Sequence, residues 1–426
     1  MNFIDELRWR GMLHDSTPGA EEALASGMTT GYIGFDPTAP SLTIGNYVQL
    51  MILSLWQKSG HRPIFLLGGA TGRIGDPSGK DKERQLKTAE ELDRNLTFQR
   101  EQAMKFLLFD GGDNSALMLN NYEFYKDMNV LDFLRDVGKN LTVNYMMSKD
   151  SVKNRLESGL SFTEFSYQLL QAYDFLCLYR QYDCRFQMGG SDQWGNITSG
   201  TEFIRRNVTD SKAYALTTPL LTKADGKKFG KSEEGNIWLD PEMTSPYKFY
   251  QFWINADDAD LSKFLRYFSM KPREEIVALE ASDDPRMVKR ELAKELTIRI
   301  HSQEAYMAVE DVSTLLFTKK ASTEQLFSIG LPSYEAISKE IPSYAFTAAQ
   351  WTSSITVLDL LTEMTDICVS KGEARRAIKN NAISINKTKI QDPEIVINRD
   401  QLIHGCYLLL ENGKKNKYLL KLEGEQ

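Results

Sequence analysis

The chain has 426 residues, 42% of them hydrophobic and 26% charged, which is enough for two to four domains with proper cores. No apolar run approaches the roughly 18 residues that span a bilayer, and the charged start MNFIDELRWRG is unlike a signal peptide, so we expect a cytoplasmic protein. The net charge of -7 argues against a uniformly basic nucleic-acid-binding surface but leaves room for a local basic patch.

Cysteine and histidine usage narrows the chemistry further. The four cysteines form no CxxC pair, so the sequence predicts neither a zinc knuckle nor a disulfide framework. The four histidines are scattered singly along the chain. A Ser-His-Asp or histidine-metal enzyme is therefore not expected, and we predict no protein-bound metal or organic cofactor.

The first predicted elements are a strand, a tight loop, a helix and a second strand. The strands are the apolar runs 32–35 and 63–67, and Gly60 stops the helix between them. The helix begins near Gly45 and has one apolar face, formed by Val48, Met51, Ile52 and Leu55. This order is the first half of a nucleotide-binding α/β sheet, whose loop and helix N-terminus present N–H groups to a phosphate. An ordinary βαβ crossover without a ligand fits the same residues.

A glycine-rich stretch, GGATGRIGDPSG, follows the second strand and forms a flexible backbone platform. Asp76 lies inside it, where a carboxylate could hold an ammonium group, and Lys80 and Arg84 follow with positive charge. A solvated loop with a charged exit is the alternative. Residues 86–110 are predicted to be helical, and residues 130–180 form a largely helical insertion before the sheet resumes.

A polar stripe runs along one predicted helix of that insertion. In EFSYQLLQAYDF, the side chains of Tyr167, Gln171 and Asp174 are spaced by four and three residues, so they share one helix face. The other faces are apolar. Such a stripe points either at solvent or into a polar pocket, and its aromatic, amide and carboxylate groups favour the pocket.

The segment CRFQMGGSDQWGN repeats the order of strand, glycine turn and helix. The strand is predicted to end at Met188, and Ser191 or Asp192 to cap the following helix. Gln187 and Asp192 would then lie at the carboxyl end of the strand, where open α/β sheets bind ligands. The next stretch, LTKADGKKFGKSEEGNIWL, is either a solvated lysine-rich loop or a mobile clamp on phosphates.

The C-terminal part begins with helical patterns and ends in a basic module. Residues 326–355, with two prolines, are predicted to be a linker. Beyond it, Ser370-Lys-Gly-Glu373 is a capping box, Ile383 and Ile385 alternate in a strand, and Asn412-Gly413 is a hairpin turn. Residues 369–389 hold one acid, Glu373, against six basic residues: Lys371, Arg375, Arg376, Lys379, Lys387 and Lys389. This excess suits an RNA backbone, and a merely solvated basic helix is the weaker alternative.

Five motifs in this order and spacing, GFDPTAPSL, GGATGRIGDPSG, YQLLQAYDF, GGSDQWGN and KFGKS, resemble those of bacterial tyrosyl-tRNA synthetases of class I. The resemblance covers nearly the whole chain. Thr43-Ile-Gly-Asn46 stands at the position of the family's HIGH motif, and Lys228-Phe-Gly-Lys-Ser232 at that of KMSKS. SKGEARRAIKNNAISIN resembles the S4-like RNA-binding module that ends the bacterial enzymes.

The resemblance implies an α/β fold in several parts. These are a Rossmann-like catalytic domain over 1–222 with a helical insertion at about 110–180, a KFGKS loop and connector over 223–244, a helical domain contacting the anticodon stem over 245–325, a linker over 326–355 and an S4-like α+β RNA-binding domain over 356–426. It also implies an enzyme that joins L-tyrosine to ATP as tyrosyl-adenylate and transfers tyrosyl to tRNA. Mg²⁺ would be bound mainly through the phosphates of ATP, and the enzyme would be a homodimer.

The resemblance also implies a role for individual residues. Tyr32 and Asp174 would hydrogen-bond the substrate phenol, and the other tyrosine contacts would be Asp76, Tyr167 and Gln171 at the α-ammonium group, with Gln187 and Gln193. ATP would contact Gly34, Asp36, Gly45, Gly190, Asp192, Lys228, Lys231 and Ser232. The residues expected to act in catalysis are Thr38, Thr43, Asn46, Lys80, Arg84, Lys228 and Lys231. RNA would contact Lys371, Arg375, Arg376 and Lys379.

One departure from the family concerns the HIGH motif, whose two histidines are replaced by Thr43 and Asn46. A TIGN form resembles the version found in many tryptophanyl enzymes. Threonine and asparagine can still donate hydrogen bonds to phosphate oxygens, and attack of a carboxylate on a phosphate needs little proton transfer. We therefore expect activation to be retained. The alternatives are a tryptophanyl-type synthetase and a non-catalytic, synthetase-like RNA-binding protein.

Overall fold

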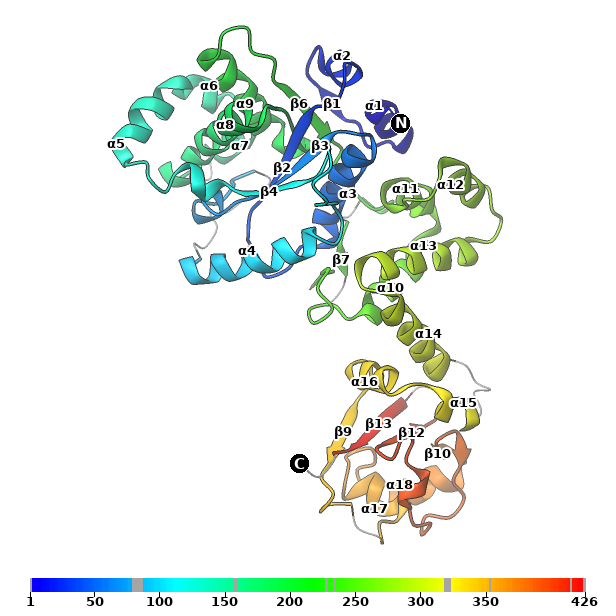
Figure 1. Cartoon of the computed structure of the whole chain (residues 1–426). Coiled ribbons are helices and arrows are strands. Elements are labelled where there is room, and N and C mark those ends of the chain that lie inside the picture. The colour runs from blue at the N-terminus through cyan, green and yellow to red at the C-terminus, as the bar shows by residue number, and fades with distance from the viewer. Residues whose placement is uncertain are drawn as a thin grey trace. The chain divides into compact units, whose positions relative to one another are not determined.

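The computed structural model describes residues 2–78, 87–156, 159–226, 229–232, 235–317, 323–351, 354–413 and 416–423. The chain divides into two compact units, whose elements are labelled in Figure 1. Unit 1 comprises Met1–Thr244 and Ile254–Leu292, and unit 2 comprises Ser245–Trp253 and Ala293–Gln426. Each unit has its own sheet, so the two are described separately.

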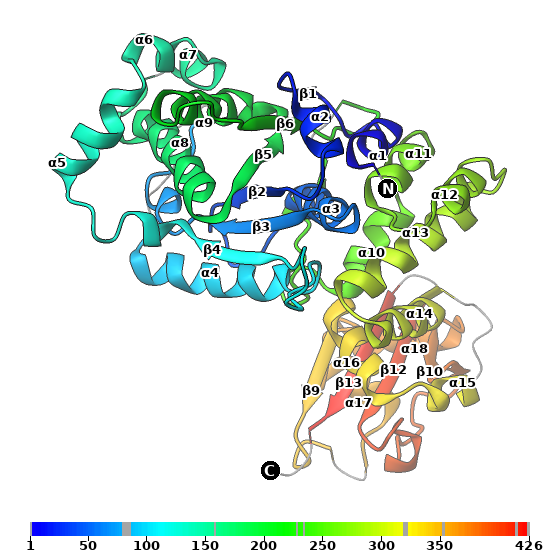
Figure 2. The same ribbon diagram turned by 45° about the horizontal axis from the view of Figure 1, so that its top comes forward.

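A six-stranded sheet forms the centre of unit 1, in the order β1-β6-β5-β2-β3-β4. Its strands are β1 Asp15–Ser16, β2 Thr30–Phe35, β3 Arg62–Leu67, β4 Leu117–Asn120, β5 Cys184–Gly190 and β6 Tyr214–Thr218. All neighbours are parallel except β1, which pairs antiparallel with β6. Figure 2 shows β3 and β4 on one side of β2, and β5 and β6 on the other. The strand order therefore reverses between β2 and β5, and in such sheets ligands bind beyond the carboxyl ends of the strands at that point.

The helices of unit 1 connect these parallel strands. Thr43 caps α3, Ile44–Lys58, which leads from β2 to β3 and buries its apolar side chains. Two further long helices flank β5 in the chain: α8, Phe162–Tyr182, precedes it and α9, Trp194–Asn207, follows it. The other helices are α1 Phe3–Arg10, α2 Ala20–Ala25, α4 Ala89–Ala103, α5 Val130–Asp132, α6 Val143–Met147, α7 Asp150–Leu156, α11 Leu261–Phe268 and α12 Arg273–Glu280. Lys231–Ser232 and Gly235–Asn236 form the small hairpin β7–β8.

The structure confirms the strand–helix–strand order predicted for residues 31–67 and corrects two local predictions. The segment 110–180 is not purely a helical insertion, because β4 pairs with β3 at the edge of the main sheet. Neither Ser191 nor Asp192 caps α9. They form a short 3-10 helix that ends at Gln193, and this turn continues directly into α9, so no separate cap is needed.

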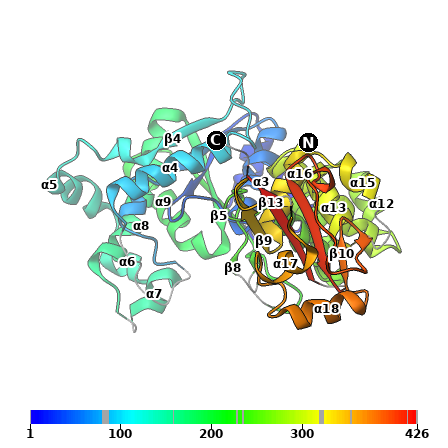
Figure 3. The same ribbon diagram turned by 90° about the horizontal axis from the view of Figure 1, so that it is seen from below.

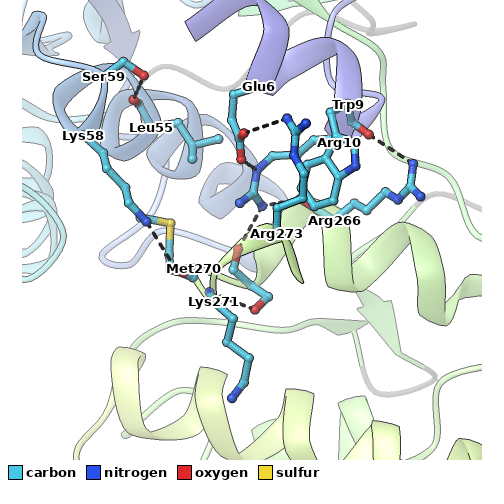
Figure 4. A network of polar contacts seen from close by, with 11 residues as sticks. Glu6, Trp9, Arg10, Leu55, Lys58, Ser59, Arg266, Met270, Lys271 and Arg273 are labelled. Atoms are coloured by element: carbon cyan, nitrogen blue, oxygen red, sulfur yellow. Dashed lines mark hydrogen bonds and ion pairs between the residues drawn. The ribbon is translucent and has the colours of Figure 1, made fainter. Parts of the chain in front are cut away.

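A buried ionic network ties α1 to α11 and α12 (Figure 4). Arg10 is 2% exposed, pairs with Glu6 at 2.7 Å, and donates to the carbonyls of Arg266 at 2.5 Å and Ser269 at 2.8 Å. Arg273 reaches the other Glu6 oxygen at 3.3 Å. The guanidinium groups of Arg273, Arg266 and Arg10 also lie 4.5–5.5 Å from the centre of the Trp9 ring. The cationic end of Arg10 thus satisfies the last carbonyls of α11, where a positive charge also suits the helix dipole.

Unit 2 combines helices with a five-stranded sheet in the order β11-β10-β12-β13-β9. Its strands are β9 Ser343–Phe346, β10 Ile383–Ile385, β11 Thr388–Lys389, β12 Tyr407–Asn412 and β13 Asn416–Leu422. Its helices are α10 Pro246–Ile254, α13 Pro285–Ile300, α14 Gln303–Phe317, α15 Thr323–Ser328, α16 Leu331–Glu340, α17 Val357–Thr362 and α18 Lys371–Lys379, of which α10 and α13 extend into unit 1. Figure 3 shows α17 and α18 side by side. No described helix of either unit is both long and apolar enough to cross a membrane.

The predicted linker 326–355 is wrong, and so is the separation of 245–325 as its own domain. Pro332 lies in the first turn of α16, where its missing N–H costs nothing, and Pro342 directly precedes β9, which pairs with β13. One core joins the helices to the strands of the tail: Val312, Leu315, Leu326, Ile329, Tyr334, Ile337, Ile403, Tyr407, Leu409 and Leu419. The helices from residue 293 onward therefore belong with the C-terminal sheet.

The basic residue Lys387 does not join the predicted RNA-binding surface. Its side chain is 11% exposed, and its ammonium group donates to the Leu315 carbonyl at 3.1 Å and to Glu411 at 2.8 Å. Lys417 makes the same two contacts. Burial, with Lys387 beside it, lowers the pKa of Lys417. These lysines satisfy an end carbonyl of α14, so their charges stabilise unit 2 instead of facing a ligand.

Candidate active site

A cavity of about 790 Å³ lies at the carboxyl ends of β2 and β5, where the strand order reverses. The predicted tyrosine-contacting residues all line it: Tyr32, Asp76, Tyr167, Gln171, Asp174, Gln187 and Gln193. So do most of the residues predicted to bind ATP or act in catalysis: Gly34, Asp36, Thr38, Thr43, Gly45, Asn46, Gly190 and Asp192. The fold thus brings residues from separate motifs to one place.

Five predicted residues cannot be placed in this cavity from their side chains. Lys80, Arg84 and Lys228 lie outside the described residues. For Lys231 and Ser232 the structure describes the backbone of β7 alone. Their roles stay predictions.

The deep end of the cavity is built around Asp174, which is 2% exposed. Asn121 Nδ2 donates to Asp174 Oδ2 at 2.8 Å, and Tyr125 Oη lies 2.7 Å from Asp174 Oδ1. Tyr32 comes from β2 and is 1% exposed, and its hydroxyl has no hydrogen-bond partner among the described residues. Because buried polar groups are normally satisfied, this free hydroxyl marks the place of a polar ligand group.

Burial controls the ionisation of this end. Desolvation raises the pKa of Asp174 to about 7, against the stabilising hydrogen bonds from Tyr125 and Asn121. Desolvation, with the nearby Asp174 charge, also raises the pKa of Tyr32. The site therefore holds a neutral phenol next to a carboxyl group whose ionised form is costly.

Two further carboxylates lie nearer the mouth. Asp36 accepts from Thr71 Oγ1 at 2.7 Å and from the Tyr167 hydroxyl at 2.9 Å. Gly68 is required beside it, because a Cβ there would meet Asp36 Oδ1 at 2.2 Å. Asp76 accepts from Gln193 Nε2 at 2.7 Å and from the Ser78 N–H at 2.9 Å. These donors are neutral groups that fix the orientation of each carboxylate.

The other end is formed by the start of α3. Thr43 and Asn46 make a capping box: the Asn46 N–H donates to Thr43 Oγ1 at 3.3 Å, and the Thr43 N–H to Asn46 Oδ1 at 3.0 Å. The Thr43 hydroxyl lies 2.7 Å from Asn46 Oδ1 and is also committed. The expectation that both side chains donate to phosphate therefore needs correcting. Between the two, the donor left for a ligand is the amide Nδ2 of Asn46.

The segment after the glycine-lysine loop is fixed to this helix start. The Ile44 N–H donates to the Ile237 carbonyl at 2.9 Å, and the Ile237 N–H to the Gly230 carbonyl at 3.0 Å. The ring of Phe229, within KFGKS, stacks on Phe268 of α11 with centroids 5.3 Å apart. The described end of the loop is thus held beside the N-terminus of α3.

Sequence reasoning missed the residues that support the site. Asn121, Tyr125 and Thr71 orient Asp174 and Asp36, and Asn196 donates to Ser78 Oγ at 3.2 Å. Asn121 and Tyr125 follow β4, the strand that the predicted helical insertion hid. Nothing in the spacing of these residues reveals bonds to side chains that lie far away in the chain.

The predicted RNA-contacting residues occupy α18. Lys371 pairs with Glu363 at 2.6 Å, and Arg375 lies 3.7 Å from Glu394. For Arg376 and Lys379 the structure gives no carboxylate partner within the described residues. These two carry the charge most available to a phosphate.

Comparison with known proteins gives a consistent family. Residues 26–318 match the model of class I tRNA synthetases (W and Y), and residues 333–420 match that of the tyrosine–tRNA ligase SYY-like C-terminal domain. The tyrosine–tRNA ligases of Cytophaga hutchinsonii and Porphyromonas gingivalis are 54% and 51% identical, over 99% of this chain and 99% and 100% of theirs. A C-terminally truncated mitochondrial tyrosyl-tRNA synthetase of Aspergillus nidulans is similar in structure, with TM-score 0.65, 30% identity, 74% of this chain and 94% of that one.

Proposed function

The chain belongs to the class I tRNA synthetases of the tyrosine–tRNA ligase family, and on that premise we propose how its cavity performs the ligation. The enzyme activates tyrosine with ATP and then transfers tyrosyl to the terminal adenosine of its tRNA. The alternatives of a tryptophanyl enzyme and of a non-catalytic relative are not supported, because the relatives named above are tyrosine–tRNA ligases. The roles of individual residues are our proposal.

The deep end binds the phenol. Tyr32 donates its unpartnered hydroxyl to the substrate oxygen, and Asp174 accepts the substrate's proton in a hydrogen bond. The single observation that carries this assignment is the buried, unsatisfied Tyr32 hydroxyl in the same cavity as Asp174. Phenylalanine would leave the Tyr32 hydroxyl unpaired and Asp174 without its substrate donor, and this penalty is the source of selectivity.

The two outer carboxylates bind the rest of the substrates. Asp76 and the amide oxygen of Gln171, which has no partner among the described residues, hold the α-ammonium group with the oxygen of Tyr167. Asp36, Gly190, Asp192 and Gln193 contact the adenylate, and Gln187 and Gly34 line the wall between the two substrates. The tyrosine carboxylate attacks the α-phosphorus, a new oxygen–phosphorus bond forms and pyrophosphate leaves with the bridging electrons.

The end of the cavity at the start of α3 binds the triphosphate of ATP and acts by positioning it and stabilising its charge. Asn46 Nδ2 and Thr38 supply neutral donors, the N-terminus of α3 supplies the positive end of its helix dipole, and the lysines of KFGKS supply positive charge. Hydrogen-bond donors bind phosphate oxygens and do not coordinate a metal ion. We therefore place Mg²⁺ on the phosphates of ATP, where it would offset their charge.

An exchange assay tests this assignment. We expect ATP–pyrophosphate exchange with tyrosine and little with tryptophan or phenylalanine. Faster exchange with tryptophan would contradict the phenol site. Binding of tRNA without any amino acid-dependent exchange would favour a non-catalytic protein.

Unit 2 supplies an RNA-binding surface in this proposal. Replacing Arg376 and Lys379 together by alanine should weaken tRNA charging several-fold and lower its salt dependence, because the salt slope falls by about one for each phosphate that is no longer bound. Lys371→Ala on the same helix should have a smaller effect, because Glu363 already neutralises that lysine. Aminoacylation at several salt concentrations measures the loss. Exchange without tRNA serves as the control, and an equal loss in both assays would argue against an RNA-binding role.

We also propose that the enzyme is a dimer and that it works in the cytoplasm. The bacterial relatives and the tRNA substrate support this location. Exposed apolar side chains between residues 130 and 143 support the dimer: Val130, Leu131, Leu134 and Val143 are 49–72% exposed. Sedimentation equilibrium decides it, because a dimer has twice the chain's mass of 48.5 kDa.

A further inference from the structure

The hydroxyl of Tyr125 faces two acceptors at hydrogen-bond distance. It lies 2.7 Å from Asp174 Oδ1 and 2.8 Å from the carbonyl oxygen of Leu170. A phenol has one proton, so it can donate fully to one of these oxygens. Both short contacts are satisfied if Tyr125 donates to Leu170 and Asp174 itself holds a proton toward Tyr125.

The surroundings of Asp174 favour the protonated carboxyl group. The groups that face it are Tyr32 from β2, Asp36 at the end of β2, Asn121 and Tyr125 after β4, and Tyr167 and Cys177 on its own helix. Asp36 brings a second negative charge, and an ionised carboxylate with 2% exposure is costly without a cation. Desolvation and Asp36 act in the same direction, raising the pKa of Asp174 to about 7.

A neutral Asp174 can still recognise a hydroxyl. With its proton on Oδ1, the acid keeps Oδ2 as a carbonyl-type acceptor with two lone pairs. Asn121 Nδ2 occupies one of them at 2.8 Å, and the other remains for the substrate. The substrate oxygen in turn accepts from Tyr32, so each of these polar groups has a partner.

We propose that Tyr125 is a positioning residue for tyrosine selection, which holds the proton of Asp174 on Oδ1 so that Oδ2 accepts from the substrate hydroxyl. Asp174 can then accept a hydrogen bond from the substrate phenol whether its own carboxyl group is neutral or ionised. Tyrosine binding therefore does not depend on a buried negative charge. This inference rests on the proposed role of Asp174 as the acceptor of the phenol.

Tyr125→Phe tests the inference through its pH dependence. In the wild type, kcat/KM for tyrosine should vary little as pH crosses 7, because both forms of Asp174 accept. In the variant, the neutral acid loses the acceptor that fixed its proton, so only the ionised form binds well. The variant should therefore be impaired below about pH 7, where Asp174 is protonated, and should recover above it, where Asp174 is ionised.

The measurement is ATP–pyrophosphate exchange between about pH 5.5 and 9, expressed as the ratio of variant to wild-type kcat/KM for tyrosine. Groups that titrate in both proteins divide out of this ratio. We expect the ratio to fall about tenfold from roughly pH 8.5 to pH 6, which corresponds to the loss of roughly one hydrogen bond. The change should appear in KM, while kcat stays within about twofold. Tyr122→Phe is the matched control, since Tyr122 is exposed on the short 3-10 turn that ends just before Tyr125, and its ratio should be flat.

Two other outcomes would contradict the inference. A ratio that does not change with pH, whether near one or uniformly low, would overturn it, since a side chain that only fills space or supports the fold acts equally at every pH. A wild-type profile with the same midpoint as the variant would overturn it as well. Asp174→Ala separates this failure from failure of the proposed function: if that variant keeps its preference for tyrosine over phenylalanine, the phenol site itself is misassigned.

Discussion

Asp174→Ala should abolish most of the enzyme's preference for tyrosine over phenylalanine. The substitution removes the acceptor for the substrate hydroxyl and leaves Asn121 Nδ2 and the Tyr125 hydroxyl without this partner. The substrate hydroxyl would then be buried without its acceptor, and this lost hydrogen bond to an unsatisfied donor should cost about 3 kcal/mol. Exchange with tyrosine should therefore fall roughly 150-fold in kcat/KM. Phenylalanine should react as fast as before or faster, because its ring no longer has to approach a buried polar acid.

The control for this experiment is Asp183→Asn, at the end of the same helix. Asp183 is exposed, has a left-handed backbone that asparagine also adopts, and pairs with Arg185 at the surface. Exchange with either amino acid should change less than about twofold, as surface pairs contribute little. An unchanged ratio of tyrosine to phenylalanine in Asp174→Ala would show that the phenol binds elsewhere.

Arg10→Met should destabilise unit 1 strongly without touching the active site. Glu6 would keep Arg273 at 3.3 Å but lose its closest partner, and the carbonyls of Arg266 and Ser269 would lose their donor. Breaking a buried ion pair from one side typically costs about 3 kcal/mol or more, because the other charge stays buried. Calorimetry should show the transition of this unit lowered by roughly 5 °C or more.

Two further variants define the cause of this loss. Arg8→Met on the same helix should shift the transition little, since Arg8 is 49% exposed and its ion pairs are screened by water. The double variant Glu6→Leu, Arg10→Met should recover part of the loss, because it removes the unpaired carboxylate as well. If the double variant is as unstable as the sum of both single variants, the two side chains are not coupled and the buried network contributes little.

Sequence patterns predicted the frame of the cavity because each wall has a local signal. Glycine-rich strand ends, the start of α3 and the polar stripe of α8 are all visible within short stretches of sequence. The partners of Asp174 could not be predicted in this way. Asn121 and Tyr125 are distant from it in the chain, and their position depends on β4 adding to the sheet edge.

Prolines and lysines misled the interpretation of the C-terminal part for a similar reason. Pro332 and Pro342 are signals of a linker or of element starts, and only the pairing of β9 with β13 decides between them. Lys387 counts as surface charge in any composition argument. Its long side chain instead delivers the ammonium group to the Leu315 carbonyl, a contact that depends on tertiary structure.

The shared core of unit 2 sets where the gene can be cut. An expression fragment that stops between residues 330 and 355 would retain Val312, Leu315 and Leu326 but lose Tyr407, Leu409 and Leu419, which pack in the same core. Such a truncated product would expose hydrophobic patches to solvent and should precipitate or need a solubilising fusion. A fragment that stops before residue 293 would lack that core but would cut α13, and it would leave Phe249 and Tyr250 of α10 without their ring partners His301 and Tyr306.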